Sequence, residues 1–270
     1  MGVNNIDYFN ISSLGNAADF GDLTRITMHA GACSNGTLAL CGAGGTGSGT
    51  NVIDYVTISS LGNATDFGDL TQARYYTGGV ESDGTKGVFS GGTSNGNVNT
   101  IDYVNIASVG NATDFGDLSA ARRNGMGASN GTRFVSAGGT EAGTVDTIEY
   151  VNFASLGNAT DFGDMAVGAA DGGSASDGTR GIFGGGDGPT DQIEILNVAS
   201  TGDSTDFGNL TAAASSPGGT GDGTKAVFIG GTRGGFVDTM DYVTMASVGN
   251  ASDFGDLTFT STGPACTSGD

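Results

Sequence analysis

The sequence predicts an all-β protein in which six four-stranded repeats of about 47 residues close into a β-propeller. The first observation is a motif, D-F-G-D-L or a close variant, that recurs six times at intervals of 47, 48, 47, 45 and 47 residues. The second is a series of Asn-Gly, Asp-Gly and Gly-Gly pairs between short apolar runs, which is typical of β-hairpins. The third is that no long segment carries a helical period.

Each copy of the motif follows an apolar segment such as Ile53–Ile58, which we expect to be a strand. Ile53 and Tyr55 point to one face of this strand, and Val56 and Ile58 to the other. Because both faces are apolar, the strand is expected to lie between packed sheets. The D-F-G-D-L segment is expected to form the next strand, with its phenylalanine available for packing. The copies begin at Asp19, Asp66, Asp114, Asp161, Asp206 and Asp253.

Two further strands complete the repeat. A small-residue strand, such as Tyr76–Val80, leads into the turn Ser82-Asp83-Gly84, whose Asp-Gly pair suits a tight hairpin. The hydrophobic strand Gly87–Phe89 follows and ends at Gly91-Gly92. Lettered a to d from the propeller axis outward, the small-residue strand is a, this strand is b, the apolar strand is c and the motif strand is d.

The ends of the chain predict how the ring closes. Five full a–d sets run from about Arg25 to Leu257, and the whole chain, 1–270, is expected to be one propeller domain. Outer strands in 5–23 and an inner strand in 258–269 would form a composite sixth blade. Strand b of that blade is absent, lost by truncation or supplied by another chain, and a five-bladed ring with frayed ends is the alternative.

The order of these elements resembles the kelch repeat: a hydrophobic strand ending in Gly-Gly, a strand with tyrosine, a strand with an aromatic residue, then a basic residue. Arg74 and Arg122 match the arginine that often opens the next kelch blade. The match is incomplete, because this arginine is missing near Ala169 and Ala214 and Ile195 replaces the tyrosine. The resemblance implies a kelch-like propeller.

The repeat sequence is also similar to tandem repeats of marine bacteriophages and their hosts. It reads N-x-I-D-Y-V-x-I-x-S-x-G-N-A-T-D-F-G-D-L. That similarity implies a virion-associated fibre, decoration or receptor-binding protein with a virion or extracellular location. We expect no signal peptide, because the residues from Met1 to Tyr8 have no basic region and lead directly into the first repeat.

Charge and composition limit the partners. The chain has 29 acidic and 9 basic residues, a net charge of −20, so nucleic acids and anionic membranes are not expected to bind. No apolar run is long enough to span a bilayer. The three cysteines form no C-x-x-C pair, and neither a disulfide framework nor a zinc site is indicated.

Enzymatic chemistry is not favoured. With the single histidine His29, the chain cannot assemble a galactose-oxidase-type copper site or a histidine-dependent triad, so we expect no catalytic residue, metal or cofactor. Paired aspartates such as Asp66 and Asp69 occur in every copy, which favours a structural role; weak calcium binding in these loops stays open. A glycan-processing enzyme on a propeller scaffold is the least favoured alternative.

The b–c connections vary among the copies while the other turns are nearly constant. Variable loops on a rigid scaffold commonly carry binding. We therefore expect a non-enzymatic protein that recognises a host-surface glycan or another virion protein through these loops. A purely structural repeat module is the alternative, and a homo-oligomer stays open. The candidate ligand-binding residues are Asn95, Asn97, Glu141, Asp187, Arg233 and Phe236.

Overall fold

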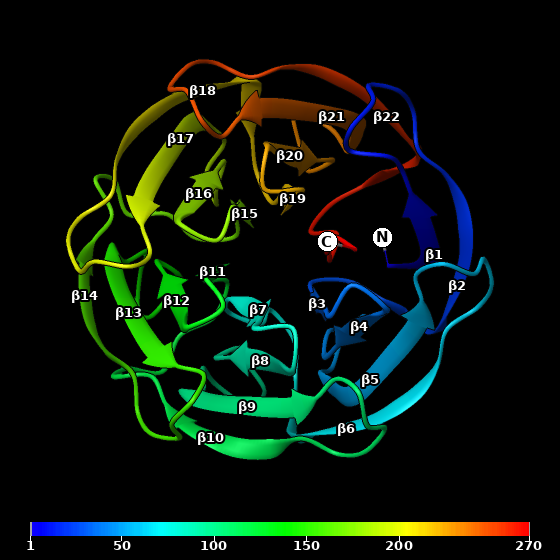
Figure 1. Ribbon diagram of the computed structural model, residues 1–270, viewed down its shortest axis with the longest axis vertical. Helices are drawn as coiled ribbons and strands as arrows, with labels where there is room; N and C mark the ends of the chain where they lie inside the picture. Colours follow the sequence, from blue (N-terminus) through cyan, green and yellow to red (C-terminus); the bar gives the residue numbers. More distant parts are fainter. Residues whose placement is uncertain (1, 270) are drawn as a thin grey trace.

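The computed structural model describes residues 2–269 and shows a β-propeller of five four-stranded antiparallel sheets around one axis (Figure 1). One two-stranded sheet lies between the first and last blades. Every regular element of this part of the chain is a strand, and none of its residues forms a helix that could cross a membrane. The predictions of an all-β propeller and of four-stranded repeats are confirmed.

Each blade runs from the axis outward in chain order, as Figure 1 shows. The first blade comprises β3 (Gly31–Ser34), β4 (Leu38–Gly42), β5 (Thr50–Thr57) and β6 (Thr65–Arg74). The second comprises β7 (Val80–Ser82), β8 (Lys86–Ser90), β9 (Thr100–Asn105) and β10 (Thr113–Asp117). The third comprises β11 (Met126–Ser129), β12 (Arg133–Ala137), β13 (Thr147–Asn152) and β14 (Thr160–Asp164). The fourth comprises β15 (Gly173–Ser176), β16 (Arg180–Gly184), β17 (Thr190–Asn197) and β18 (Thr205–Ala214). The fifth comprises β19 (Gly218–Gly221), β20 (Lys225–Ile229), β21 (Val237–Thr244) and β22 (Ser252–Ser261).

The prediction of six blades is wrong, and the five-bladed alternative is what the structure contains. The remaining sector holds β1 (Val3–Tyr8) and β2 (Ala18–Thr27), which pair only with each other. Residues 258–261, expected to begin an inner strand, instead extend β22, and 262–269 run toward the axis without forming a strand. The physical reason is the missing strand b: without it, an inner segment has no neighbour within its own sheet to complete a hydrogen-bonded ladder.

The ring is nevertheless closed at its rim by one contact repeated six times, which we call the rim clasp. Between β2 and the first blade, the Asp22 amide donates to Asn63 Oδ1 at 3.1 Å, and the Gly62 amide donates to the Phe20 carbonyl at 3.0 Å. Between the fifth blade and the closing sector, the Asp256 amide donates to Asn16 Oδ1 at 3.1 Å. The constant G-N-A-T-D-F-G-D wording of the repeat is therefore explained by contacts between sectors.

The glycine of the motif is required by this close approach. A Cβ placed on Gly21 would lie 2.4 Å from the Gly62 carbonyl oxygen, and one on Gly255 would lie 2.5 Å from that of Gly15. Both glycines also have φ near +150°, a conformation that other residues rarely adopt. The clasp can form only where the side chain is absent.

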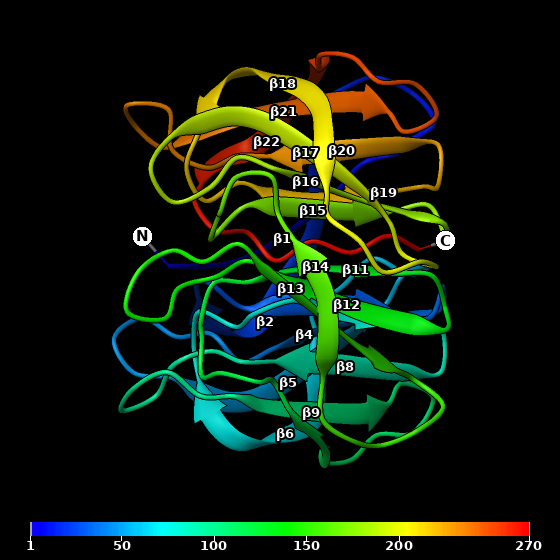
Figure 2. The same ribbon diagram turned by 90° about the vertical axis from the view of Figure 1, so that its left-hand side faces the viewer.

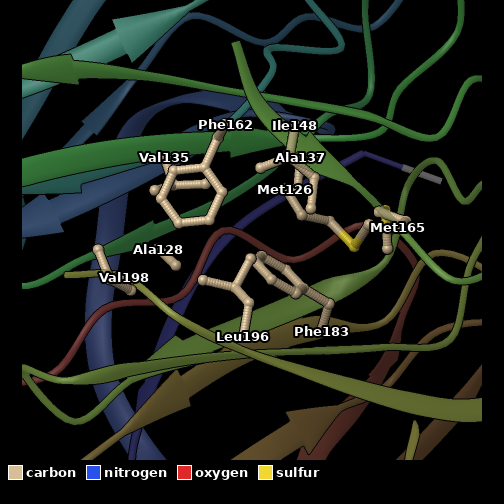
Figure 3. Packing of buried hydrophobic residues seen from close by; sticks show 10 residues of the cluster. All are labelled: Met126, Ala128, Val135, Ala137, Ile148, Phe162, Met165, Phe183, Leu196 and Val198. Atoms are coloured by element: carbon tan, nitrogen blue, oxygen red, sulfur yellow. The ribbon is translucent and has the colours of Figure 1, made fainter. Parts of the chain in front are cut away.

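The hydrophobic core lies between neighbouring blades. Figure 3 shows one cluster, in which Val135 and Phe162 of the third blade pack with Phe183 and Leu196 of the fourth. Edge-to-face pairs such as Tyr103–Phe115, with ring centroids 5.8 Å apart, extend the packing to the rim. Because each interface is built from two blades, no blade completes its core alone.

Strand c carries a buried carboxylate in every blade: Asp54, Asp102, Glu149, Glu194 and Asp241. Arg74 and Arg122, the residues that resemble the kelch arginine, lie fully buried and pair with the carboxylates of the following blades, Asp102 and Glu149. The arginine thus joins neighbouring blades through a charge that would be costly to bury alone.

Blades without this arginine are compensated in other ways. Arg233, from the b–c loop of the fifth blade, places Nη2 2.5 Å from Asp241 Oδ2, and Arg25 of β2 pairs with Asp54 at 2.6 Å. Glu194 accepts a hydrogen bond from the Ser204 hydroxyl, and Ser204 stands where the other copies have alanine. Each buried carboxylate therefore has a partner suited to its own copy.

Candidate functional site

One position of the repeat combines an unusual backbone with variable chemistry. Six residues, spaced 47, 48, 47, 45 and 47 apart, precede the innermost segments and have φ between 51° and 59°. We call them the mouth hexad. They are His29, Tyr76, Asn124, Asp171, Ser216 and Gly263. Five of the six are not glycine, although this left-handed conformation is unfavourable for other residues and especially for bulky ones.

Backbone hydrogen bonds between sectors hold this conformation. The Asn124 amide donates to the Tyr76 carbonyl at 3.0 Å, and the Asp171 amide donates to the Asn124 carbonyl at 2.7 Å. The Gly263 amide donates to the Ser216 carbonyl at 2.8 Å. Strained backbone that the surrounding structure enforces is concentrated at functional sites, so the mouth hexad is a candidate for one.

Five members of the mouth hexad, all but Gly263, line a cavity of about 520 Å³ at one end of the axis. This end carries the d–a links and the b–c loops, since Thr93 and Asp187 of those loops also line the cavity. Beneath the hexad, the space between the inner strands narrows to about 100 Å³. We call the 520 Å³ cavity the bowl; its volume is within the range of small-ligand pockets.

Aromatic rings cover one side of the bowl. The rings of His29 and Tyr76 have centroids 4.2 Å apart, and those of Tyr75 and Tyr76 are 4.8 Å apart. The His29 imidazole also lies against Gly263 of the closing sector, since a Cβ on this glycine would be 2.5 Å from His29 Nδ1. The glycine at that position is required to leave room for the imidazole.

Polar groups face the rings across the axis. His29 Nδ1 lies 3.8 Å from Asp171 Oδ1, although the two residues belong to the first and fourth blades. The Ser216 hydroxyl donates to the Asp171 carboxylate. Burial, the Asp171 charge and Tyr75 hold the pKa of Tyr76 above its usual range, so its hydroxyl keeps a proton to donate at neutral pH.

Two buried atoms of the hexad lack a hydrogen-bond partner among residues 2–269. They are His29 Nδ1 and Asn124 Oδ1, on side chains that are about nine-tenths buried. An unpaired buried polar atom costs about 1–3 kcal/mol unless something else satisfies it. Both residues line the bowl, although the two atoms themselves are buried, so a ligand or ordered water would gain these bonds only if the side chains turned toward it.

The sequence matches no model of a known protein family and no curated protein.

The six residues predicted to bind a ligand are placed very differently. Asp187 is exposed and lines the bowl. Asn97 does not line the bowl, but it accepts a hydrogen bond at 3.2 Å from Arg123, which does. Asn97 also donates to the carbonyls of Thr140 and Glu141.

Arg233, Phe236 and Asn95 also lie outside the bowl. Arg233 is held by Asp241 in the ion pair described above, and its position is explained by that role. Phe236 is 51% exposed and Asn95 is exposed, and neither lines the cavity. The b–c loops thus share a face with the bowl but contribute only Asp187 and Thr93 directly.

Sequence reasoning missed the mouth hexad. The signal was present, because an alignment of the six copies shows two adjacent positions before strand a that differ in every copy. The second of them changes from histidine to tyrosine, asparagine, aspartate, serine and glycine, and the position after it carries only small residues or proline. No pattern in one copy indicates a left-handed backbone at a tyrosine, and convergence on the axis appears only when six copies are placed in a ring.

The opposite end of the axis has a separate polar lining. Serines from successive copies surround a cavity of about 220 Å³, and the Ser82 hydroxyl donates to the Ser34 carbonyl of the neighbouring blade. Glu81 lines the same cavity and accepts a hydrogen bond from the Ser129 hydroxyl at 3.1 Å. Burial raises the pKa of Glu81 to about 7, despite the opposing effect of Ser129.

No group of three or more His, Cys, Asp or Glu side chains in the described residues could hold a metal ion. The loops considered for weak calcium binding, with Asp66 and Asp69, contribute instead to the rim clasp, where the Asp69 amide donates to Asn111 Oδ1 at 3.1 Å. The bowl therefore offers hydrogen bonding and stacking as its chemistry.

Proposed function

We propose that the protein is a non-enzymatic binding protein and that the bowl above the mouth hexad recognises a saccharide. The observation that carries the proposal is the hexad itself: five of its six equivalent positions line one cavity, and each of the five presents a different side chain to it. A purely structural ring has no need for such variation, and none for the backbone strain that accompanies it.

The chemistry of the bowl favours a neutral sugar. Tyr75 and Tyr76 offer a stacking face, while Asp171, Asn124 and Arg123 offer acceptors and donors for hydroxyl groups. The two carboxylates of the bowl, Asp171 and Asp187, add to a net charge of −20 and disfavour anionic sugars. A host-surface glycan fits this description better than the flat face of another virion protein.

The proposed setting is a virion-associated fibre, decoration or receptor-binding protein. Its support is the similarity of the kelch-like repeat wording to marine bacteriophage repeats. Mass spectrometry of purified phage particles tests this setting separately from ligand binding. A protein absent from particles yet able to bind glycans would keep the binding proposal and remove the virion one.

A glycan array with wild type and matched variants tests the binding proposal. Tyr76→Asn and Asp171→Asn change the bowl while keeping a residue type that the hexad already contains at Asn124, so the backbone conformation is tolerated. We expect each to weaken binding at least tenfold with an unchanged Tm. Asn95→Ala and Phe236→Ala, on the outer loops, are expected to bind as wild type does.

The alternative is a structural repeat module without a ligand. It is favoured if wild type binds no glycan on the array at micromolar protein concentrations. Loss of binding in the outer-loop variants alone would instead place the site on the b–c loops.

A further inference from the structure

The closing sector lacks the two inner strands that all five blades possess. In each blade, strand b (β4, β8, β12, β16 or β20) lies between the innermost and third strands. In the closing sector, a cavity of about 180 Å³ lies in that place, with β1 on one side and 262–267 on another. At about 10–15 Å³ for one water, it has room for roughly a dozen waters.

Apolar side chains wall this cavity, and their equivalents in the other sectors are more deeply buried. Ala39 and Cys41 of the first blade are half-buried, whereas the residues at the same two positions in the other four b strands are all buried. Ile6 of β1 and Leu257 of β22 are also half-buried and line the cavity. The residues equivalent to Ile6 are each fully buried: Ile53, Ile101, Ile148, Ile193 and Met240.

The backbone of β1 is also incomplete on this side. It pairs with β2 alone, whereas the third strand of every blade pairs on both edges. β1 ends at Tyr8, two residues before Asn10, the position equivalent to the end of β21 at Thr244. An unpaired edge of this kind is a template for another strand.

The fifth blade shows the register that an added strand would take. There β20 runs antiparallel to β21, with Lys225 opposite Thr244 and Ile229 opposite Met240. Met240 and Thr244 correspond to Ile6 and Asn10 in the closing sector. Five residues of an added strand would therefore lie opposite residues 6–10.

We propose that this cavity is a strand-acceptor site, which binds an extended segment of a separate polypeptide antiparallel to β1. Each of the five b strands in residues 2–269 is already paired on both edges, so the described chain has none to donate. The expected segment has the alternation of β8, β16 and β20: a basic residue, a small residue, Val or Ile, Phe, then a residue leading to Gly-Gly. This is binding by strand addition, in which backbone bonds give affinity and side-chain pockets give selectivity.

The contacts of β20 indicate how each side chain would sit. Phe228 lies beside Gly184 of the preceding blade, where a Cβ would be only 2.7 Å from its ring. Ile229 is the equivalent of Gly184 in the fifth blade, so the phenylalanine of an added strand would contact Ile229 and would need a different rotamer from that of Phe228. The Lys225 ammonium donates to the Ile11 carbonyl at 3.0 Å in the following sector. In the same geometry, a basic residue of the added strand would reach the carbonyl of Ile58.

A labelled synthetic peptide with the sequence of residues 224–231, T-K-A-V-F-I-G-G, tests the proposal by fluorescence anisotropy. We expect saturable binding with a Kd in the micromolar range and a rise in Tm at saturating peptide. A peptide with proline in place of its valine lacks one amide donor and should bind at least tenfold more weakly.

A protein variant provides the matched control. Cys41→Phe introduces the residue that stands at this position in β8, β16 and β20, and its ring would fill the cavity. Ala39→Phe, which copies Phe134 of β12, is a second variant for the same purpose. Either folded variant should lose peptide affinity at least tenfold. The proposal is overturned if wild type does not bind the peptide at 0.1 mM, which is roughly a hundred times a micromolar Kd. It is also overturned if the proline peptide binds wild type as tightly as the unmodified peptide does, or if both folded variants bind the unmodified peptide as tightly as wild type does.

Discussion

Arg74 Nη2 lies 3.0 Å from Asp102 Oδ2, and both side chains are fully buried although they belong to different blades. The pair lies where strand d of the first blade passes the third strand of the second. Burial lowers the pKa of Arg74 while the Asp102 charge opposes that change, so the carboxylate offsets part of the cost of burying the guanidinium. The interface is thus held by a contact that neither blade could make alone.

Breaking this pair is expected to be severe. Arg74→Ala should lower the free energy of unfolding by about 3–5 kcal/mol, because it leaves Asp102 as an uncompensated buried charge. Urea unfolding measures the change. The double variant Arg74→Met with Asp102→Leu should lose much less, since it removes both charges; a double variant as unstable as Arg74→Ala would contradict this explanation.

Arg233 is expected to affect stability rather than ligand recognition. Arg233→Ala removes the partner of the buried Asp241 and should lower the free energy of unfolding by about 1–3 kcal/mol. Phe236→Ala, in the same loop but exposed, should change it by less than about 0.5 kcal/mol. If Arg233→Ala unfolds at the wild-type urea midpoint yet loses glycan binding, the arginine is a ligand contact after all.

Ring closure at the rim can be tested with an internal control. Asn16→Ala breaks the clasp between the fifth blade and the closing sector, and Asn63→Ala breaks the clasp between β2 and the first blade. Each should cost about 0.5–1.5 kcal/mol in urea unfolding, since each removes one side-chain hydrogen bond. A loss for Asn63→Ala with none for Asn16→Ala would show that the ring is open at its ends.

Glu81 should make stability fall as pH rises. Below about pH 4.5 the carboxyl is protonated in both folded and unfolded chains; between there and about pH 7 only the unfolded chain releases its proton. Stability is therefore highest at low pH and lost through this interval, by about 3 kcal/mol. We expect the difference in unfolding free energy between Glu81→Gln and wild type to grow from pH 5 to pH 8. A constant difference would mean that Glu81 has an ordinary pKa.

Some of this fold was predictable because the responsible physics is local to one copy. The strand expected at Ile53–Ile58 matches β5, and Gly87–Phe89 lies within β8, since apolar periodicity and hairpin glycines act over a few residues. The inner strand expected at Tyr76–Val80 instead begins at Val80. Tyr76 has a left-handed backbone. Gly79 lies so close to the next blade that a Cβ placed on it would be 2.8 Å from the Gly127 backbone.

The closing sector and the candidate site were less accessible for a different reason. Two outer strands and an inner segment can form a blade only if strand b lies between them. The repeat sequences at the two ends of the chain do not reveal that this strand is missing. The role of Arg233 depends on the missing arginine at Ala214, a compensation between segments of two neighbouring blades. The bowl is formed by single residues from six sectors, so its chemistry appears only in the assembled ring.

A crystal structure of the protein with the saccharide that binds best on the array tests the central claim most directly. The proposed function predicts the sugar on the axis, stacked against Tyr75 or Tyr76 and hydrogen-bonded to Asp171 or Asn124. Sugar bound over Phe236 or Asn95, away from the mouth hexad, would contradict it.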